Sequence, residues 1–127
     1  MLVYVAAAYS SVEDKDALMK AIMRFTGEYM LTNRGSALVS PLFNHYSLDQ
    51  VPTLGTDWVF WKEYSTTLLR KCDEMIVLVT NDTASSTGVR AEVELATELG
   101  INITYFDMDK CITLSKEIND FASANNE

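Results

Sequence analysis

Residues 74–92 read EMIVLVTNDTASSTGVRAE, and they place three kinds of local structure in direct succession. The run 74–80 is apolar and rich in β-branched residues, which predicts a buried strand. The run 81–88 holds four hydroxyl side chains, two other polar residues and a glycine, which predicts a loop. Residues 89–99 then show helical spacing of apolar positions and end at Gly100. The stretch is therefore a strand–loop–helix unit of the kind that builds a parallel sheet.

The same alternation continues on both sides of this unit. The other predicted strands are 2–8, 36–40 and 101–106, and the other predicted helices are 12–32, 57–71 and 114–124. We expect Ser10 or Ser11 to cap the first helix, the Asn33-Arg34-Gly35 run to end it, and 43–56 to be a loop. The order predicts one α/β domain over 1–127, a Rossmann-like or flavodoxin-like three-layer sandwich with four or five parallel strands. Ligands of such folds bind beyond the carboxyl ends of the strands.

Composition and charge exclude several classes of protein. The 127 residues are 48% hydrophobic and 22% charged, as in ordinary globular proteins, and the formal net charge is −8. A chain this acidic is not expected to bind a nucleic-acid polymer. No apolar run is long enough to cross a bilayer, and the amino terminus lacks the basic region of a signal peptide. We therefore expect no membrane partner and a cytoplasmic location, with Cys72 and Cys111 as reduced thiols.

The candidate ligand site is the polar loop 81–88 together with the start of the helix after it. Free backbone N–H groups and the helix dipole there favour an anion, and one phosphate can be held by amides and hydroxyls alone. Glu92 follows in the same helix and could face the pocket that the loop encloses. The alternative is that the hydroxyls only cap the helix and Glu92 is solvated. The sequence has one histidine, two distant cysteines and no Walker or G-x-G-x-x-G motif, so we expect no metal and no cofactor.

Five short motifs spread over nearly the whole chain resemble the nucleoside 2-deoxyribosyltransferase-like superfamily. They are Val3-Tyr4-Val5-Ala6, Ser40-Pro41, Trp58-x-Phe60-Trp61, Cys72-Asp73 and Ser86-x-Gly88-x-x-x-Glu92-x-x-x-Ala96. The last has the spacing of the 2'-deoxynucleoside 5'-phosphate N-hydrolases in that group. The chain looks closest to a related family of uncharacterised phage and bacterial proteins.

The resemblance implies a function and a set of site residues. Glu92 matches the glutamate that attacks the anomeric carbon of the sugar and expels the base, and Tyr4 matches an active-site tyrosine, although a core aromatic would look the same. Ser86 matches a hydroxyl that binds the 5'-phosphate. The further phosphate- and nucleotide-binding positions that we expect are Thr87, Gly88, Ala7, Ser10, His45, Trp61 and Ser65. The family also implies a homodimer or higher homo-oligomer.

One position departs from the family pattern. The second predicted helix usually carries an aspartate that orients the sugar or handles the proton of the leaving base, and here that position is Ser65. Glu63 is two residues away, about 200° around a helix, so it would face elsewhere. Three readings therefore stay open. The chain is an N-glycoside hydrolase or deoxyribosyltransferase acting on a (deoxy)nucleoside 5'-monophosphate, a non-catalytic nucleotide-binding protein, or a partner-binding protein built on this fold.

Overall fold

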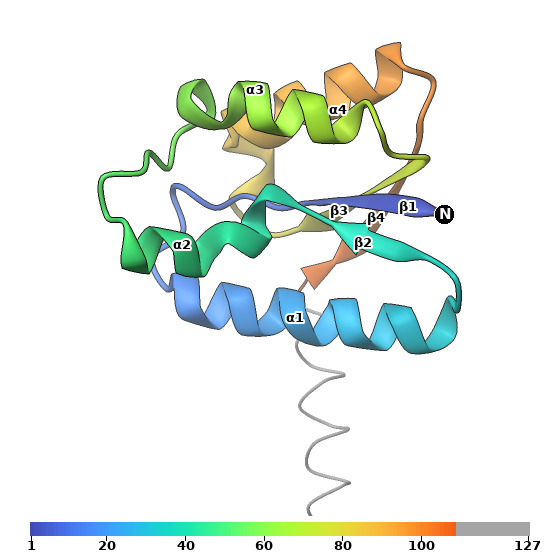
Figure 1. Cartoon of the computed structure of the whole chain (residues 1–127), viewed down its shortest axis with the longest axis horizontal. Helices are drawn as coiled ribbons and strands as arrows, with labels where there is room; N and C mark the ends of the chain where they lie inside the picture. Colours follow the sequence, from blue (N-terminus) through green and yellow to red (C-terminus); the bar gives the residue numbers. More distant parts are fainter. Residues whose placement is uncertain (109–127) are drawn as a thin grey trace, which may run out of the picture.

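The computed structural model describes residues 1–108 of the chain and shows an α/β sandwich (Figure 1). The elements along the chain are β1 (Leu2–Ala6), α1 (Lys15–Thr32), β2 (Ala37–Val39), η1 (Pro41–Asn44), α2 (His45–Gln50), α3 (Trp58–Leu69), β3 (Glu74–Val79), η2 (Thr83–Ser85), α4 (Thr87–Glu98) and β4 (Asn102–Asp107). The helix predicted at 114–124 and Cys111 lie outside the described residues.

The sheet is parallel throughout, with the strand order β2-β1-β3-β4. The two central strands pair in a register that sets Tyr4 opposite Met75, and β3 pairs with β4 along its full length, from Glu74 opposite Asn102 to Val79 opposite Asp107. Asp73, which precedes β3, accepts a hydrogen bond from the N–H of Leu2 at 2.8 Å and so links the starts of β3 and β1. The predicted α/β class with a four-stranded parallel sheet is confirmed, and its order fits a flavodoxin-like sandwich.

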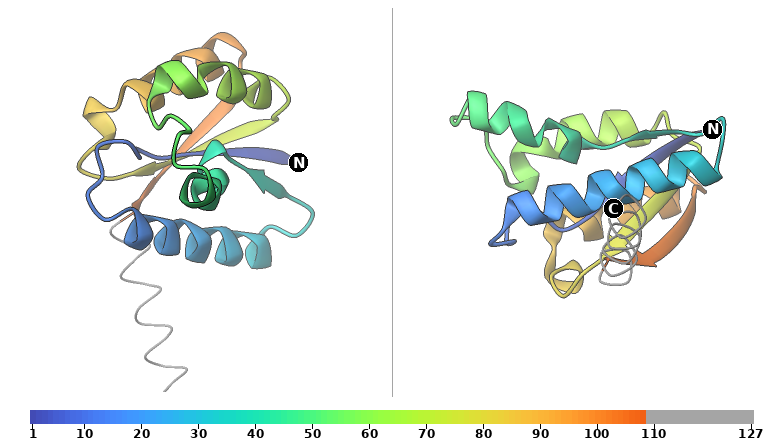
Figure 2. Two further views of the ribbon diagram at one scale, coloured as in Figure 1. Left: turned by 60° about the vertical axis from the view of Figure 1, so that its left-hand side comes forward. Right: turned by 90° about the horizontal axis from the view of Figure 1, so that it is seen from below.

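Helices cover both faces of the sheet, with α1 on one side and α3 and α4 on the other (Figures 1 and 2). The side chains of β1 alternate between the two cores, as the pleat of a strand requires. Val3 and Val5 pack with the buried face of α1, whereas Tyr4 and Ala6 pack toward α3 and α4. This alternation sends the Tyr4 side chain into the layer that also holds α4.

The first helix begins later than the sequence predicts. It starts at Lys15, and neither Ser10 nor Ser11 caps it, because the Asp14 carboxylate accepts a hydrogen bond from the Ala17 N–H at 3.0 Å. The residues before Asp14 form turns instead of a first helical turn. The helix ends at Thr32, and Gly35 takes up a positive φ of 94° in the turn that follows, as the Asn33-Arg34-Gly35 run predicts.

The segment 43–56 is not wholly a loop. The Ser40 side chain accepts from the Leu42 N–H at 3.1 Å, and with Pro41 it opens the turn η1, which continues into the six-residue helix α2. A helix this short has too few turns to show a 3.6-residue periodicity, so the sequence pattern could not reveal it. Within residues 1–108, no helix is long and apolar enough to cross a membrane.

Candidate functional site

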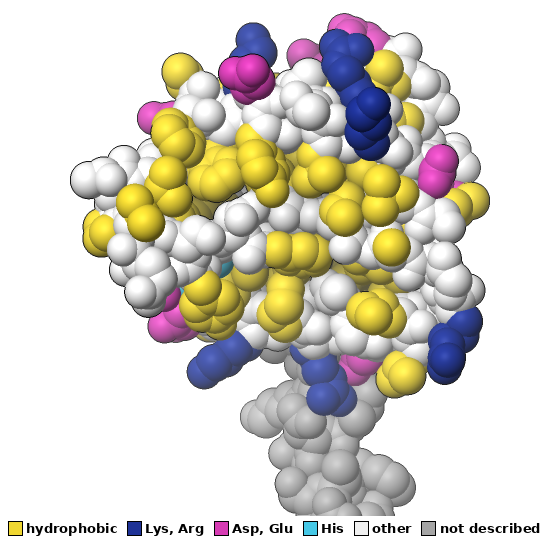
Figure 3. Space-filling view, in the orientation of Figure 1, with side chains coloured by type: hydrophobic (Ala, Val, Ile, Leu, Met, Phe, Trp, Pro, Cys, Tyr) yellow, Lys and Arg dark blue, Asp and Glu magenta, His cyan; other side chains and the backbone are white. Residues whose placement is uncertain are grey.

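A pocket of about 570 Å³ opens where the carboxyl ends of the strands meet α2, α3 and α4. Figure 3 shows hydrophobic side chains gathered between α3 and α1, with Lys and Arg above and below them. Of the ten residues that the sequence predicts for the site, nine line this pocket: Ala7, Ser10, His45, Trp61, Ser65, Ser86, Thr87, Gly88 and Glu92. The tenth, Tyr4, lies behind Glu92. Their common location is observed, and their roles stay predictions.

The floor of the pocket is a buried carboxylate. Glu92 is only 9% exposed, and its Oε2 accepts a hydrogen bond from the hydroxyl of Tyr4, which is fully buried on β1. The two residues are 88 positions apart in the chain. Glu92 sits on the second turn of α4, on the helix face that also carries the buried Val89 and Ala96. The alternative reading of the sequence, a solvated Glu92, is therefore wrong.

Burial changes the titration of both groups. It raises the pKa of Glu92 from 4.5 to about 7, and the hydrogen bond from Tyr4 partly opposes that rise. The pKa of Tyr4 is raised far above its ordinary value, first by burial and then by the charge of Glu92, while a hydrogen bond with Ser65 acts in the opposite direction. Tyr4 therefore stays a donor, and the carboxylate titrates near neutral pH.

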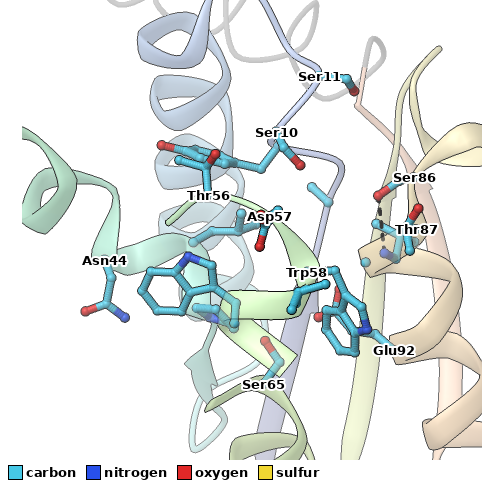
Figure 4. A pocket seen from close by; sticks show the side chains of 18 of the residues that line it. Ser10, Ser11, Asn44, Thr56, Asp57, Trp58, Ser65, Ser86, Thr87 and Glu92 are labelled. Carbon is cyan, nitrogen blue, oxygen red and sulfur yellow. Dashed lines mark hydrogen bonds between the residues drawn. The ribbon is translucent and has the colours of Figure 1, made fainter. Parts of the chain in front are cut away.

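The amino terminus of α4 forms one wall of the pocket (Figure 4). The Ser86 hydroxyl oxygen accepts from the Val89 N–H at 3.2 Å, which leaves the hydroxyl hydrogen available for another acceptor. The N–H groups of Thr87 and Gly88 have no acceptor within the helix, because first-turn amides precede the i−4 ladder. This wall combines the cap that the sequence predicts with donors that an anion requires.

Gly88 has no side chain to fill the part of the pocket next to Glu92. A Cβ at this position would lie 3.6 Å from the Trp58 ring, 3.9 Å from Glu92 Oε1 and 4.0 Å from Ser86 Oγ. These are ordinary van der Waals distances, so the fold does not require glycine here for steric reasons. The missing Cβ instead leaves the space between the carboxylate, the hydroxyl and the indole open to a ligand.

Ser65, where the resemblance implies an aspartate, lies on the side of α3 that lines the pocket. Ser65 is buried and lines the cavity, whereas Glu63 is exposed on another face of α3. Asp57 also lines the pocket, and its Oδ1 accepts from the Phe60 N–H at 2.9 Å as the cap of α3. On the side of the pocket formed by α3, the Ser65 hydroxyl therefore lies at the middle of the helix and the exposed Asp57 carboxylate lies at its amino terminus.

Both tryptophans of the chain line the pocket. The Trp61 indole N–H donates to the Gly55 carbonyl at 2.5 Å, which holds the ring in place, and Trp58 lies beside Gly88 and Glu92. Figure 4 shows Trp58 next to Glu92 and Asn44 on the opposite side of the opening. The two indoles provide flat apolar surfaces of the kind on which a nucleobase stacks.

His45 is buried, and its ring contacts Tyr9, which is not among the predicted site residues. Its Nδ1 is 2.6 Å from the hydroxyl of Tyr9, and its Nε2 is 3.4 Å from Asp16 Oδ1. Tyr9 also lines the pocket. Its location just beyond β1 was the available signal, because strand ends of a parallel sheet point to the ligand site.

Residues 1–108 contain no cluster of histidine, cysteine or carboxylate side chains that could hold a metal ion. No family model and no curated protein matches the sequence. The inference about function therefore rests on the arrangement of these side chains and on the motifs described above.

Proposed function

We propose that this protein cleaves the N-glycosidic bond of a (deoxy)nucleoside 5'-monophosphate, as a hydrolase or a deoxyribosyltransferase, with Glu92 as the nucleophile. The observation that carries the proposal is one buried carboxylate facing a pocket that also contains an open helix amino terminus. Structural carboxylates are rarely buried without a cationic partner, because desolvation of the charge is unfavourable. Catalytic carboxylates in clefts are the common exception, because burial shifts their pKa toward the value that the reaction requires.

The spacing of the groups suits a sugar phosphate. Glu92 Oε1 and Ser86 Oγ lie 3.9 Å and 4.0 Å from the same point beside Gly88. They are therefore no further apart than these two distances together, and one pentose 5'-phosphate can reach both. The phosphate would bind to the Ser86 hydroxyl and the first amides of α4, and the base would lie against Trp58 or Trp61.

The reaction would proceed in two steps with retention at the anomeric carbon. The ionised Glu92 attacks that carbon, the bond to the base nitrogen breaks, and the electron pair leaves with the base. Water or a second base then attacks the glycosyl-enzyme and frees the carboxylate. The Tyr4 hydroxyl stabilises the ionised form of Glu92 before the attack and after its release.

The direct test is base release from a panel of nucleoside 5'-monophosphates, followed by chromatography. We expect turnover by the natural protein and none by Glu92→Gln, because an amide of nearly the same shape is a poor nucleophile. Binding of the nucleotide by Glu92→Gln should persist. Unchanged turnover in this variant would remove Glu92 as the nucleophile.

The phosphate site has its own test in Ser86→Asp. Aspartate caps a helix as well as serine does, so the unfolding free energy should stay close to that of the natural protein. Its charge would repel a phosphate, so we expect nucleotide binding to weaken by at least about tenfold, against little change for the matching nucleoside. Equal effects on both ligands would place the phosphate elsewhere.

The second candidate is a non-catalytic nucleotide-binding protein, and Ser65 favours it because a hydroxyl cannot act as an acid at neutral pH. The separating observation is a rise in melting temperature with nucleoside monophosphates in the absence of base release. If base release appears only after Ser65→Asp, the natural chain binds its ligand without efficient turnover.

A further inference from the structure

A chain of hydrogen bonds lies across the pocket from the amino terminus of α4. Tyr9 follows β1, His45 is the first residue of α2, and Asp16 stands in the first turn of α1. The fold brings the three together: the Tyr9 hydroxyl is 2.6 Å from His45 Nδ1, and His45 Nε2 is 3.4 Å from Asp16 Oδ1. Figure 4 shows Asn44, the neighbour of His45, on the far side of the opening from Ser86 and Glu92.

The rings of Tyr9 and His45 are held in place by further contacts. The Tyr9 and His45 rings meet edge to face with centroids 5.7 Å apart, and the Lys15 ammonium lies 5.3 Å from the centre of the Tyr9 ring. Burial raises the pKa of Tyr9, and the charges of Asp49 and Asp16 raise it further, so the phenol keeps its proton at neutral pH. Tyr9 therefore keeps its hydroxyl hydrogen next to His45, and its side chain is one of those that line the pocket.

Breaking an N-glycosidic bond leaves an electron pair on a base nitrogen, and a proton delivered there makes the base a better leaving group. Four side chains that line the pocket can ionise: Tyr9, His45, Asp57 and Glu92. Glu92 is taken as the nucleophile, and Asp57 is exposed and engaged in capping α3. Tyr9 with His45 is the remaining pair, and a hydroxyl hydrogen-bonded to an imidazole suits proton transfer.

Resting on the proposed function, we propose that Tyr9 and His45 deliver the proton to the leaving base, with Asp16 as a positioning residue. In the first step the Tyr9 hydroxyl gives its proton to the base nitrogen and takes one from Nδ1 of protonated His45, which becomes neutral. The Nε2–H of His45 stays directed at Asp16 throughout. In the second step the attacking water gives its proton to the Tyr9 oxygen, whose own proton returns to Nδ1, so the relay is restored.

The test compares two substrates that differ by one N7-methyl group, and therefore in charge and in the need for a proton on the leaving base. These are 2'-deoxyguanosine 5'-monophosphate and its N7-methyl derivative, whose base is already cationic and leaves as a neutral molecule. Tyr9→Phe keeps the ring and removes the oxygen, and we expect it to lower kcat for the first substrate by about 10²–10⁴-fold. For the methylated substrate the loss should be less than about tenfold. His45→Asn should show the same contrast, and Asp16→Asn a smaller one, also confined to the unmethylated substrate.

The matched control is Tyr46→Phe, which removes a hydroxyl from an exposed tyrosine whose ring also contacts His45 but does not line the pocket. It should leave kcat for both substrates unchanged. Equal losses on both substrates in Tyr9→Phe, or no loss on either, would overturn the relay and leave Glu92 chemistry standing. Absence of base release by the natural protein from both of these nucleotides and from the whole panel of nucleoside 5'-monophosphates would overturn the proposed function, and the relay with it.

Discussion

Glu92→Gln should stabilise this protein at neutral and alkaline pH. The side chain is buried, and glutamine preserves its shape and the acceptor for the Tyr4 hydroxyl while removing the charge. The rise in the pKa of Glu92 from 4.5 to about 7 corresponds to about 3 kcal/mol at about 1.4 kcal/mol per pKa unit. That is the free energy by which the ionised carboxylate destabilises the folded state, and it is large beside a typical domain stability of about 5–15 kcal/mol.

The pH at which the effect appears follows from proton binding by the two states. Between pH 4.5 and about 7 the folded protein holds a proton on Glu92 that the unfolded chain has released, so the stability of the natural protein falls as the pH rises through this window. Below the window both states are protonated and the penalty is absent. Above it both are ionised and the penalty is complete. Glutamine does not titrate, so the gap between variant and natural protein should open from near zero at pH 4.5 to about 3 kcal/mol at pH 8.

Urea denaturation of both proteins from pH 4.5 to 8.5 measures this gap, because the unfolding free energy is obtained at each pH. Glu94→Gln, on an exposed position of the same helix, is the control for the loss of one negative charge, and its curve should run parallel to that of the natural protein. A Glu92→Gln gap that is constant with pH, or a natural protein that is the more stable of the two at pH 8, would refute a carboxylate held ionised against its burial.

Three further predictions concern the same region. Tyr4→Phe removes the hydrogen-bond donor from the buried carboxylate, so the pKa of Glu92 should rise above 7 and the acid limb of the kcat/KM profile should move to higher pH; a shift to lower pH would contradict this role. Gly88→Ala should keep or raise the melting temperature, since alanine is favoured in helices by about 1 kcal/mol, while its methyl group, 3.9 Å from Glu92 Oε1, weakens ligand binding in titrations; a destabilised variant would show that the contacts are not ordinary. Light scattering at micromolar concentration should give twice the monomer mass, since Val59 and Phe60 expose apolar surface on α3, and a monomer mass would count against the dimer.

Local patterns in the sequence were sufficient for the sheet and for most of the helices. The buried strand at Glu74–Val79, the helix that follows Ser86, and the stop after Thr32 depend on periodicity, capping chemistry and glycine, which act over a few residues. The start of α1 was predicted too early because Ser10, Ser11 and Asp14 are all residue types that cap helices, and in the structure Asp14 is the cap. The six residues of α2 were missed because one and a half turns carry no periodic signal.

The sequence also indicated which residue types form the candidate site, but not their burial, their contacts or their pKa values. The sequence by itself placed hydroxyls and Glu92 at the start of a helix that follows a strand, and the order of strands and helices directed them to one edge of the sheet. Only the tertiary structure showed that Glu92 is buried against Tyr4, and that Tyr9, His45 and Asp16 meet. These contacts join segments that are 29 to 88 positions apart. Burial, and with it the pKa of a carboxylate, depends on what the rest of the fold packs around the group, and no local pattern contains that information.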